Sequence, residues 1–279
     1  VGSEMCIRDR NGTTNYRLSQ MTETGVSYAN ALADAQKQGF AEADPTNDVC
    51  GFDAARKLAI LSSIGFRANI TFDDVLVEGI EKIDKSDIQY AKDMGYTIKL
   101  LTVALRQENG IALNVYPAFL PDNHPLSSVK GAYNAIYVTG NIVDDVMFYG
   151  RGAGALPTAS AVMGDVISTA QHILNGSTGT GMIMTDTKRI PFYSSLKLQN
   201  SYYFRLDVDD VTGVLSQIAA AFAENDISIC EVVQKRKTKG LAELVLITEL
   251  ASRESILQVE KALQVLPCMR KVANVIRVM

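Results

Sequence analysis

Residue types that support metal and cysteine chemistry are scarce in this 279-residue sequence. It contains no Trp, two His and four Cys, and the cysteines lie far apart without C-x-x-C spacing. His124 and His172 have no partner at the spacing that metal ligands show, so we expect no metal site. Widely spaced cysteines are typical of a protein in a reducing cytoplasm. With so few histidines, we expect proton transfer to depend on Lys, Asp or Glu.

Basic stripes and long apolar runs are also missing. The net charge is -4, and the 27 Lys and Arg residues are dispersed among 31 Asp and Glu, so we expect no nucleic-acid partner. The longest apolar runs, such as residues 244–247, fall far short of the roughly 18 residues that cross a bilayer. No G-x-G-x-x-G motif follows an apolar strand near the start, so we expect this chain to lack a dinucleotide-binding Rossmann domain.

The first ten residues carry little structural signal. The chain begins with Val rather than Met, and residues 1–10 show neither a secretory apolar region nor a periodic pattern. We therefore interpret the chain as N-terminally truncated, with a non-native leader over residues 1–10, and leave that segment out of the predicted fold.

Hydrophobic periodicity predicts a first α+β unit with a mixed or antiparallel sheet over residues 11–175. Helices are predicted where apolar residues recur at three and four, and strands where they alternate. Thr24 and Ser86 are expected to be helix N-caps. The predicted helices cover residues 24–38, 86–95, 158–174 and the segment that carries Ala54, Leu58, Leu61 and Ile64 on one face. The predicted strands form two hairpins, 97–105 with 111–119 and 134–139 with 143–149.

A second unit is predicted over residues 201–279. Residues 176–200 are rich in Gly, Ser and Thr and lack periodicity, which indicates a linker. The pattern after this linker alternates strand and helix signals in a β-α-β-β-α-β order, typical of a ferredoxin-like fold. The predicted strands cover 202–208, 227–234, 241–248 and 272–278, and the predicted helices cover 213–224 and 252–263.

Asp53 and Lys57 are the strongest candidates for chemistry in the first unit. Their spacing of four places both side chains on one helix face. Such a pair is usually solvated and contributes at most about 0.5 kcal/mol. Glu42, Asp44 and Asp48 crowd the preceding loop, and carboxylates beside a lysine can hold a substrate ammonium while they tune the lysine. Asp48 also suits a helix cap, and the loop does not match the calcium pattern of an EF-hand.

Two glycine-containing segments suggest contact with an anion or cofactor. Residues 150–154, Gly-Arg-Gly-Ala-Gly, precede a predicted helix and could present backbone N–H groups to phosphate. Tight packing or positive φ explains these glycines equally well. Residues 11–16, Asn-Gly-Thr-Thr-Asn-Tyr, could likewise be a turn followed by a threonine cap.

These segments together resemble the homoserine dehydrogenase catalytic domain. Residues 11–16, then 35–36 and 39–57, are similar to the signature of that family, and residues 149–162 are similar to its second block. The resemblance covers nearly all of residues 11–175. It implies NAD(P)-dependent interconversion of L-aspartate 4-semialdehyde and L-homoserine, on the route to threonine, methionine and isoleucine.

The resemblance also implies a role for each candidate residue. Lys57 would donate a proton to the substrate carbonyl oxygen, and Asp53 would orient the substrate beside it. Glu42 and Asp48 would bind the amino-acid end. The residues implied on the side of the NADP or NAD cofactor are Asn11, Thr13, Gly39 and Gly154. Because the family's nucleotide-binding domain would precede Asn11, the 279-residue chain alone is expected to be inactive.

The second unit resembles an ACT module, a small ligand-sensing domain. Residues 209–215 stand at its usual acidic strand-to-helix loop, with Thr212 where a Pro is usual. The resemblance implies an amino-acid effector such as threonine, and a homo-oligomer. A different function for the same sequence is a non-catalytic amino-acid sensor built on the ACT module.

Overall fold

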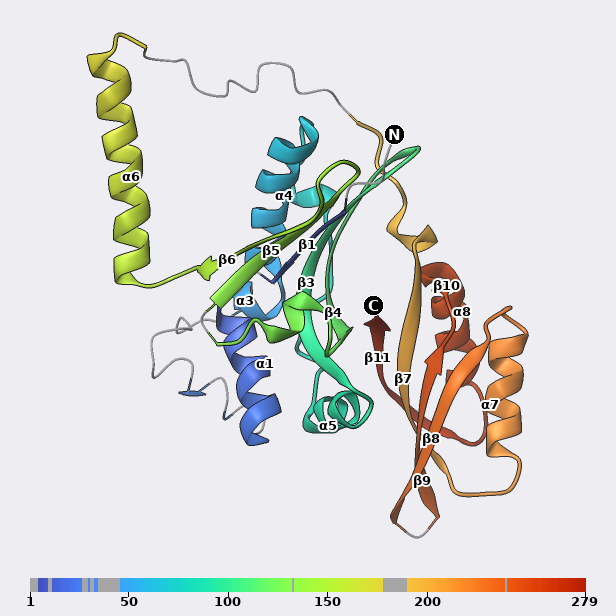
Figure 1. The fold of residues 1–279 in the computed structure, drawn as a ribbon. Coiled ribbons are helices and arrows are strands. Elements are labelled where there is room, and N and C mark those ends of the chain that lie inside the picture. The colour runs from blue at the N-terminus through green and yellow to red at the C-terminus, as the bar shows by residue number, and fades with distance from the viewer. Residues whose placement is uncertain are drawn as a thin grey trace.

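The strands of the chain join into one continuous mixed sheet. The computed structural model describes residues 5–9, 12–26, 30, 33–34, 46–131, 133–177, 190–238 and 240–279. We call residues 5–177 the N-terminal unit and residues 199–278 the C-terminal unit. Figure 1 shows the two units side by side, with their strands meeting at β4 and β11.

The N-terminal unit combines a twisted sheet with helices on one face. Its strands are β1 (Met5–Asp9), β2 (Leu76–Val77), β3 (Tyr96–Gln107), β4 (Gly110–Pro121), β5 (Tyr133–Gly140) and β6 (Asp144–Arg151). Its helices are α1 (Gly12–Thr24), α3 (Thr46–Val49), α4 (Phe52–Phe66), α5 (Lys85–Asp93) and α6 (Ala155–Leu174). Short 3-10 turns η1 (Phe72–Asp74) and η2 (Pro125–Ser128) complete the described part. Both predicted hairpins are confirmed, because β3 pairs antiparallel with β4 and β5 with β6.

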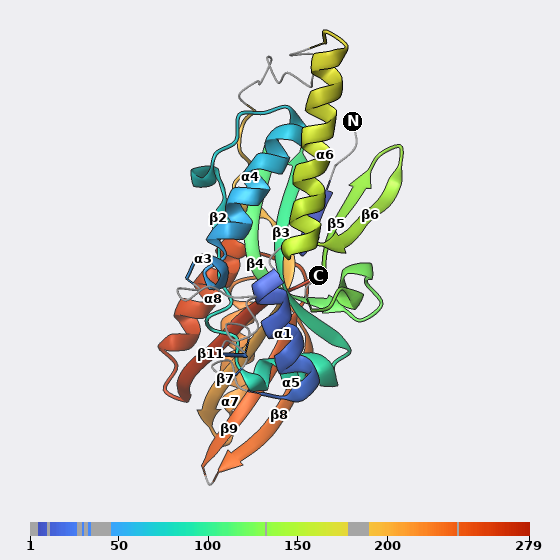
Figure 2. The ribbon, with the colours of Figure 1, turned by 90° about the vertical axis from the view of Figure 1, so that its left-hand side faces the viewer.

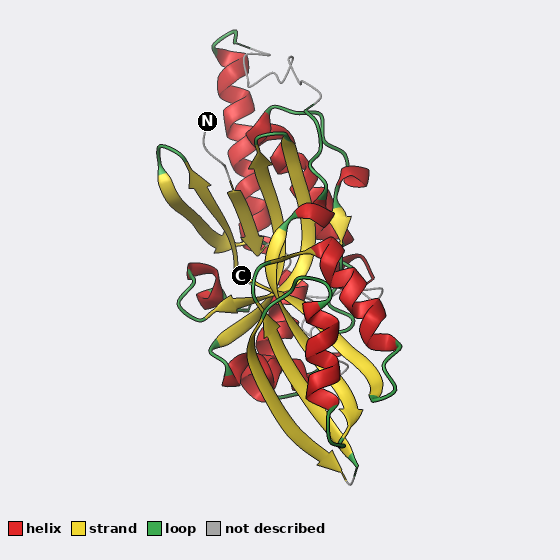
Figure 3. Ribbon diagram, turned by 90° about the vertical axis from the view of Figure 1, so that its right-hand side faces the viewer, coloured by secondary structure: helices red, strands yellow, loops and turns green. Residues whose placement is uncertain are grey.

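The C-terminal unit has the predicted ferredoxin-like order. It consists of β7 (Gln199–Asp209), α7 (Val214–Ala223), β8 (Ile229–Thr238), β9 (Leu241–Thr248), the short β10 (Ala251–Ser252), α8 (Arg253–Gln264) and β11 (Met269–Val278). Its four main strands lie in the order β11-β7-β9-β8. The two helices cover the outer face of these strands (Figure 3). Under them pack the even-numbered residues of β7, such as Tyr202, Phe204 and Leu206.

A parallel pair joins the sheets of the two units. β11 pairs with β4 at Arg277 opposite Ala118 and Val278 opposite Phe119, so the sheet runs β6-β5-β1-β3-β4-β11-β7-β9-β8. The Phe119 and Tyr203 rings meet across this junction with their centroids 4.5 Å apart. The sequence pattern predicted two units but gave no sign of this shared sheet.

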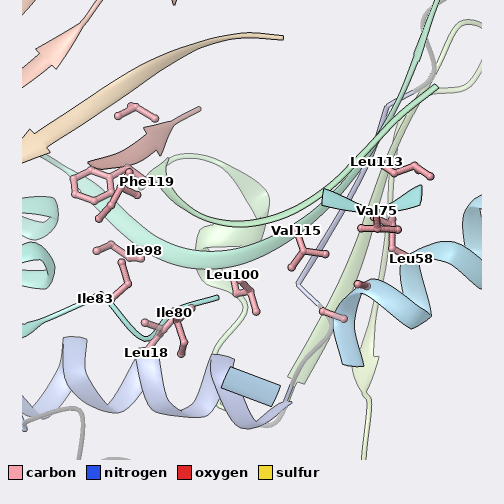
Figure 4. Close-up of a cluster of buried hydrophobic side chains, with 14 of the residues drawn as sticks. Leu18, Leu58, Val75, Ile80, Ile83, Ile98, Leu100, Leu113, Val115 and Phe119 are labelled. Atoms are coloured by element: carbon pink, nitrogen blue, oxygen red, sulfur yellow. The ribbon is translucent and has the colours of Figure 1, made fainter. Parts of the chain in front are cut away.

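The main hydrophobic core lies between the sheet and helices α1, α4 and α5. Leu18 of α1, Leu58 of α4 and Leu100 of β3 are almost fully buried in it. Figure 4 shows how side chains from these helices, from the strands and from the loop after β2 point toward one another. The same cluster continues into the C-terminal unit through Tyr203 and Val245.

Four details of the sequence prediction need correction. Residues 5–9, which we left out of the fold, form β1 between β3 and β5 because backbone pairing needs no periodicity. Thr24 ends α1 rather than capping a helix, and most of the predicted helix 24–38 lies outside the described residues. Asp84, not Ser86, caps α5, since its carboxylate accepts hydrogen bonds from two backbone N–H groups. On α4, Ile64 is exposed and Phe66 is buried instead.

The expected linker over residues 176–200 is described only in part. Residues 190–193 run beside β4, where the Ile111 N–H donates to the Pro191 carbonyl and the Tyr193 N–H donates to the Ile111 carbonyl. The turn η3 (Ser195–Lys197) precedes β7. The domain limits at residues 10, 175 and 201 stay predictions.

Helix α6 stands apart from the sheet (Figure 1), and it lies in front when the molecule is viewed from that side (Figure 2). All its residues except Pro157 are exposed, including apolar side chains at Leu156, Val166 and Ile167. Among the described residues, no helix is long and apolar enough to cross a membrane.

Buried charges hold α5 of the N-terminal unit against the C-terminal unit. Arg205, on the inner face of β7, donates from Nε to Asp87 Oδ1 at 2.8 Å and from Nη1 to Glu243 Oε2 at 3.3 Å. Asp87 is fully buried and also accepts hydrogen bonds from the Tyr203 hydroxyl and the Asn274 amide. Burial lowers the pKa of Arg205, but its hydrogen bonds and the neighbouring carboxylates outweigh this effect and raise the pKa above its ordinary value. The guanidinium is therefore charged throughout the pH range in which the protein is folded.

A second ion pair between the units predicts how stability depends on pH. Arg277 donates to both oxygens of Glu78, at 2.7 and 3.0 Å. Burial raises the pKa of Glu78, but the hydrogen bonds and charge of Arg277 and the charge of Arg253 outweigh it, so the pKa lies below its ordinary 4.5. A lowered pKa in the folded state means that this stabilisation is complete above pH 4.5 and is lost as the pH falls through the lowered value.

We expect Tm measured between pH 7 and pH 3 to fall more steeply for the unmodified protein than for Glu78→Gln. The glutamine variant lacks the titrating carboxylate, so the difference isolates this group from the other acids. Parallel Tm profiles below pH 4.5 would contradict the assignment.

Candidate functional site

The side chains of Asp53 and Lys57 meet on the first turns of α4. Lys57 Nζ lies 2.6 Å from Asp53 Oδ2, and the two side chains are 42% and 32% exposed. The predicted shared face is therefore confirmed. A pair this exposed contributes about 0–1 kcal/mol to stability, and it leaves the ammonium accessible from solvent. The arrangement can present one positive and one negative group to a small polar molecule.

A tight turn fixes where α4 begins. Gly51 precedes the helix with φ of 82°, a left-handed conformation that glycine adopts without strain. A Cβ on Gly51 would lie 3.0 Å from Val115 Cγ1 and 3.2 Å from Val77 Cγ1. The turn is thus pressed against β2 and β4, and the start of α4 is held close to the sheet. Asp53, in the first helical turn, also suits the positive end of the helix dipole.

Arg56 makes contacts that stabilise the same turn on its solvent-facing side. Its Nη1 donates to Asn47 Oδ1 of α3 at 3.2 Å, and its guanidinium lies 5.3 Å from the centre of the Phe72 ring. Phe72 in turn packs edge-on against Phe52, the first residue of α4. These contacts tie α3 to α4 and keep the two helices in one orientation.

Asp48 lies on α3, immediately before this turn. Its side chain is half-buried, and its carbonyl accepts the Gly51 N–H at 3.1 Å. The structure thus places Asp48 within one short helix–turn segment of Asp53 and Lys57, and we call these three residues the candidate site. Glu42 and Gly39 lie outside the described residues.

The residues expected on the cofactor side are described only in part. Asn11 lies outside the described residues, and Thr13 belongs to the first turn of α1. Gly154 is exposed and caps α6 with φ of 119° and ψ of 155°, a conformation that requires glycine whatever its contacts. A Cβ at Gly154 would meet Pro157 at 3.5 Å and, among the described residues, no other side chain within 4 Å. Backbone conformation alone therefore explains this glycine.

A buried lysine next to α1 was not among the predicted site residues. Lys99, on β3, is 2% exposed. Its Nζ donates to Asn15 Oδ1 at 2.6 Å and to the Val129 carbonyl. The available signal was a lysine between two apolar residues, Ile98 and Leu100, within the predicted strand 97–105. This lysine ties α1 to the sheet and to the turn after η2.

In the part of the chain that the structure describes, no three His, Cys, Asp or Glu side chains gather where they could hold a metal ion.

Comparisons with known proteins agree with both resemblances. Residues 10–167 match the homoserine dehydrogenase family model, and residues 202–268 match the ACT domain model. The homoserine dehydrogenase of Mycobacterium tuberculosis is 43% identical over 277 residues, an alignment that includes 96% of this chain and 62% of that protein. The chain therefore spans about 62% of the length of this curated relative.

Solved structures show the same fold. A homoserine dehydrogenase from Thiobacillus denitrificans superimposes with a TM-score of 0.92 at 34% identity, over 99% of this chain and 64% of that one. A hyperthermophilic archaeal homoserine dehydrogenase in complex with NADPH matches 61% of this chain and 48% of its own, with a TM-score of 0.50 and 26% identity. The expected fold class, a mixed-sheet catalytic unit followed by a ferredoxin-like ACT unit, is confirmed.

Proposed function

We propose a function for this chain, which belongs to the homoserine dehydrogenase family. It supplies the proton donor and the substrate-binding residues for the NAD(P)-dependent interconversion of L-aspartate 4-semialdehyde and L-homoserine. The observation that carries the proposal is the 2.6 Å contact between Lys57 and Asp53, inside the block of residues 39–57 that resembles the family signature. The family match over residues 10–167 disfavours a purely sensory protein.

Lys57 is the proposed proton donor. In the reductive direction a bound nicotinamide cofactor would supply the hydride that reduces the aldehyde carbon. The Lys57 ammonium gives one proton to the carbonyl oxygen, which becomes the hydroxyl of homoserine. The neutral amine then takes a proton from water, so the lysine is restored. Asp53, in contact with the ammonium, orients the lysine and the substrate beside it.

Carboxylates are proposed to select an amino acid as substrate. Asp48 lies on the same helix–turn segment as the lysine, and Glu42 belongs to the same sequence block. Negative charge at both positions would complement the substrate ammonium. This arrangement favours an α-amino acid over a simple aldehyde.

The residues of the cofactor side are proposed from the family resemblance and from the exposure of Gly154. We assign Asn11, Thr13, Gly39 and Gly154 to the approach of NADP or NAD, and the exposed main chain at Gly154 leaves room for it. NADPH bound to the archaeal relative supports the cofactor class. Because no G-x-G-x-x-G motif follows an apolar strand near the start of this sequence, we expect the purified 279-residue chain not to oxidise homoserine with NADP. Turnover by that chain would overturn this expectation.

The ACT unit is proposed to bind an amino-acid effector, with threonine as the first candidate. The proposed loop is residues 209–215, in which Gly213 has φ of 87° and Asp209 accepts a hydrogen bond from Arg270 at 2.6 Å. Calorimetry that shows no binding of any aspartate-family amino acid would remove this proposal. We also propose that the protein is cytoplasmic and that it forms a homo-oligomer.

Binding of L-homoserine to the chain tests the substrate assignment directly. We expect saturable binding by calorimetry, weakened about tenfold or about 1.4 kcal/mol in Asp53→Asn, since one carboxylate that orients the site is lost. Gln89→Ala is a matched control, because Gln89 and Asp93 form a similar contact of 2.6 Å on the surface of α5. Equal affinities for all three proteins would contradict the role of Asp53.

A further inference from the structure

The loop between β2 and α5 touches both the C-terminal unit and the turn that joins α3 to α4, next to the candidate site. We call residues 78–84 the bridge loop. Ile80 and Ile83 anchor it in the main core, with exposures of 0% and 3%, and Figure 4 shows both side chains pointing toward Leu18 and the strands. An anchored loop moves as a unit, so a shift on one side is passed to the other.

On one side, the bridge loop is bound by side chains of β11. Arg277, which is 4% exposed, forms the two hydrogen bonds to Glu78 described above. Its guanidinium also lies 4.1 Å from the centre of the Tyr116 ring, so its plane is fixed. Asn274, three residues earlier, donates to the Lys82 carbonyl at 2.9 Å.

The end of the bridge loop is held by β7. Arg205 donates from Nη2 to the Asp84 carboxylate, which also caps α5. The C-terminal unit therefore binds the first, fifth and last residues of the loop.

On the other side, the bridge loop packs against the turn that begins α4. The Ile80 N–H donates to the Val49 carbonyl at 3.0 Å. At Gly79 there is no room for a side chain, because a Cβ would lie 2.5 Å from the Val49 oxygen and 2.7 Å from Cys50 Cα. Cys50 Sγ donates to Glu81 Oε1 at 3.2 Å. The three residues that touch the turn lie between those that touch the C-terminal unit.

The turn contacted by the bridge loop carries the candidate site. Val49 and Cys50 follow Asp48 directly, and Asp53 lies three residues after Cys50. A displacement of this turn therefore changes the direction in which the first turn of α4 presents Asp53 and Lys57.

We propose that Glu78 and Arg277 are positioning residues, which set the α3–α4 turn through the bridge loop and so couple the C-terminal unit to the candidate site. A ligand that shifts β11 would thereby alter substrate binding without touching substrate. The proposal rests on the proposed function for the identity of that substrate, whereas the coupling itself is a property of the contacts described here.

Hydrogen exchange read by mass spectrometry tests the coupling. In Glu78→Gln we expect amides of residues 46–58 to exchange at least tenfold faster than in the unmodified chain, with little change at the β5–β6 hairpin. Lys235→Gln is the matched control, since Lys235 and Asp93 also form an ion pair between the units, at 3.5 Å, but away from the bridge loop. Equal exchange over 46–58 in both variants, or an increase spread evenly over a variant that remains folded, would overturn the proposal.

Two further variants keep the test decisive if Glu78→Gln unfolds. Arg277→Lys retains the charge but not the paired hydrogen bonds, and we expect the same local increase with a smaller size. Gly79→Ala presses directly on Val49 and Cys50, so exchange should rise at 46–58 while β11 remains protected. Unchanged exchange over 46–58 in both variants would overturn the proposal.

Homoserine titration separates a failure of this inference from a failure of the proposed function. If the unmodified chain binds L-homoserine, Glu78→Gln is expected to weaken binding at least tenfold and Lys235→Gln to leave it unchanged. If the unmodified chain binds no homoserine, the proposed function loses its support and the exchange result alone decides the coupling. Faster exchange at 46–58 with unchanged homoserine affinity would overturn the positioning role.

Discussion

Replacing Lys57 with Ala is expected to lower kcat for homoserine oxidation by about 10²- to 10⁴-fold, the usual contribution of a positioned general acid or base. The assay uses an enzyme in which this chain is joined to the dinucleotide-binding part of a relative, and it follows NADP reduction at saturating homoserine. In the oxidative direction the Lys57 amine accepts the proton that the homoserine hydroxyl loses in the transition state, so the loss should fall on kcat more than on KM.

Lys92→Ala provides the control, since Lys92 is an exposed lysine on the last turn of α5. Its kcat is expected to equal that of the unmodified enzyme. An unchanged kcat in Lys57→Ala would remove the lysine from the chemistry, and a loss confined to KM would reduce its role to binding.

Replacing Arg205 with Met is expected to lower the free energy of unfolding by about 3–5 kcal/mol, because it leaves the fully buried Asp87 without its cation. The remaining donors to Asp87, which are the Tyr203 hydroxyl, the Asn274 amide and the Asp84 N–H, carry no charge. Urea unfolding followed by circular dichroism measures the change, provided that the slope of the transition is the same in both proteins.

The double variant Arg205→Met/Asp87→Leu should recover part of this loss, since the fully buried Asp87 carboxylate is then absent. Lys235→Gln, which removes an exposed pair between the same two units, should cost about 0–1 kcal/mol. A loss below 1 kcal/mol in Arg205→Met would show that Asp87 finds other compensation.

Local pattern was sufficient for most elements of the fold. Alternation predicted β3 and β4 around residues 108–110, and it predicted the order of strands and helices in the C-terminal unit, because each of these elements buries one face of its own. The Asp53 and Lys57 contact was predictable for a similar reason, since a spacing of four fixes the geometry within one helix.

Contacts between distant residues were not predictable in this way. Helix α1 escaped notice because its Thr, Asn and Ser residues have modest helix propensity, and it is stabilised by the burial of Leu18 and Met21 against the sheet. In the sequence, Arg205 and Arg277 are indistinguishable from the solvent-facing polar residues of alternating strands. Their partners, on α5 and beside β2, lie more than a hundred residues away, and no local pattern connects them.

The parallel pairing of β11 with β4 affects the order in which the protein can fold during synthesis. β11 leaves the ribosome after every other described strand, yet it lies between β4 and β7 in the sheet. Until it arrives, one backbone edge of β4 at Ala118 and Phe119 and one backbone edge of β7 have no neighbouring strand. The edge of β4 therefore stays unpaired until β11 has been synthesised. Such long-range pairing slows folding and exposes the nascent chain to aggregation.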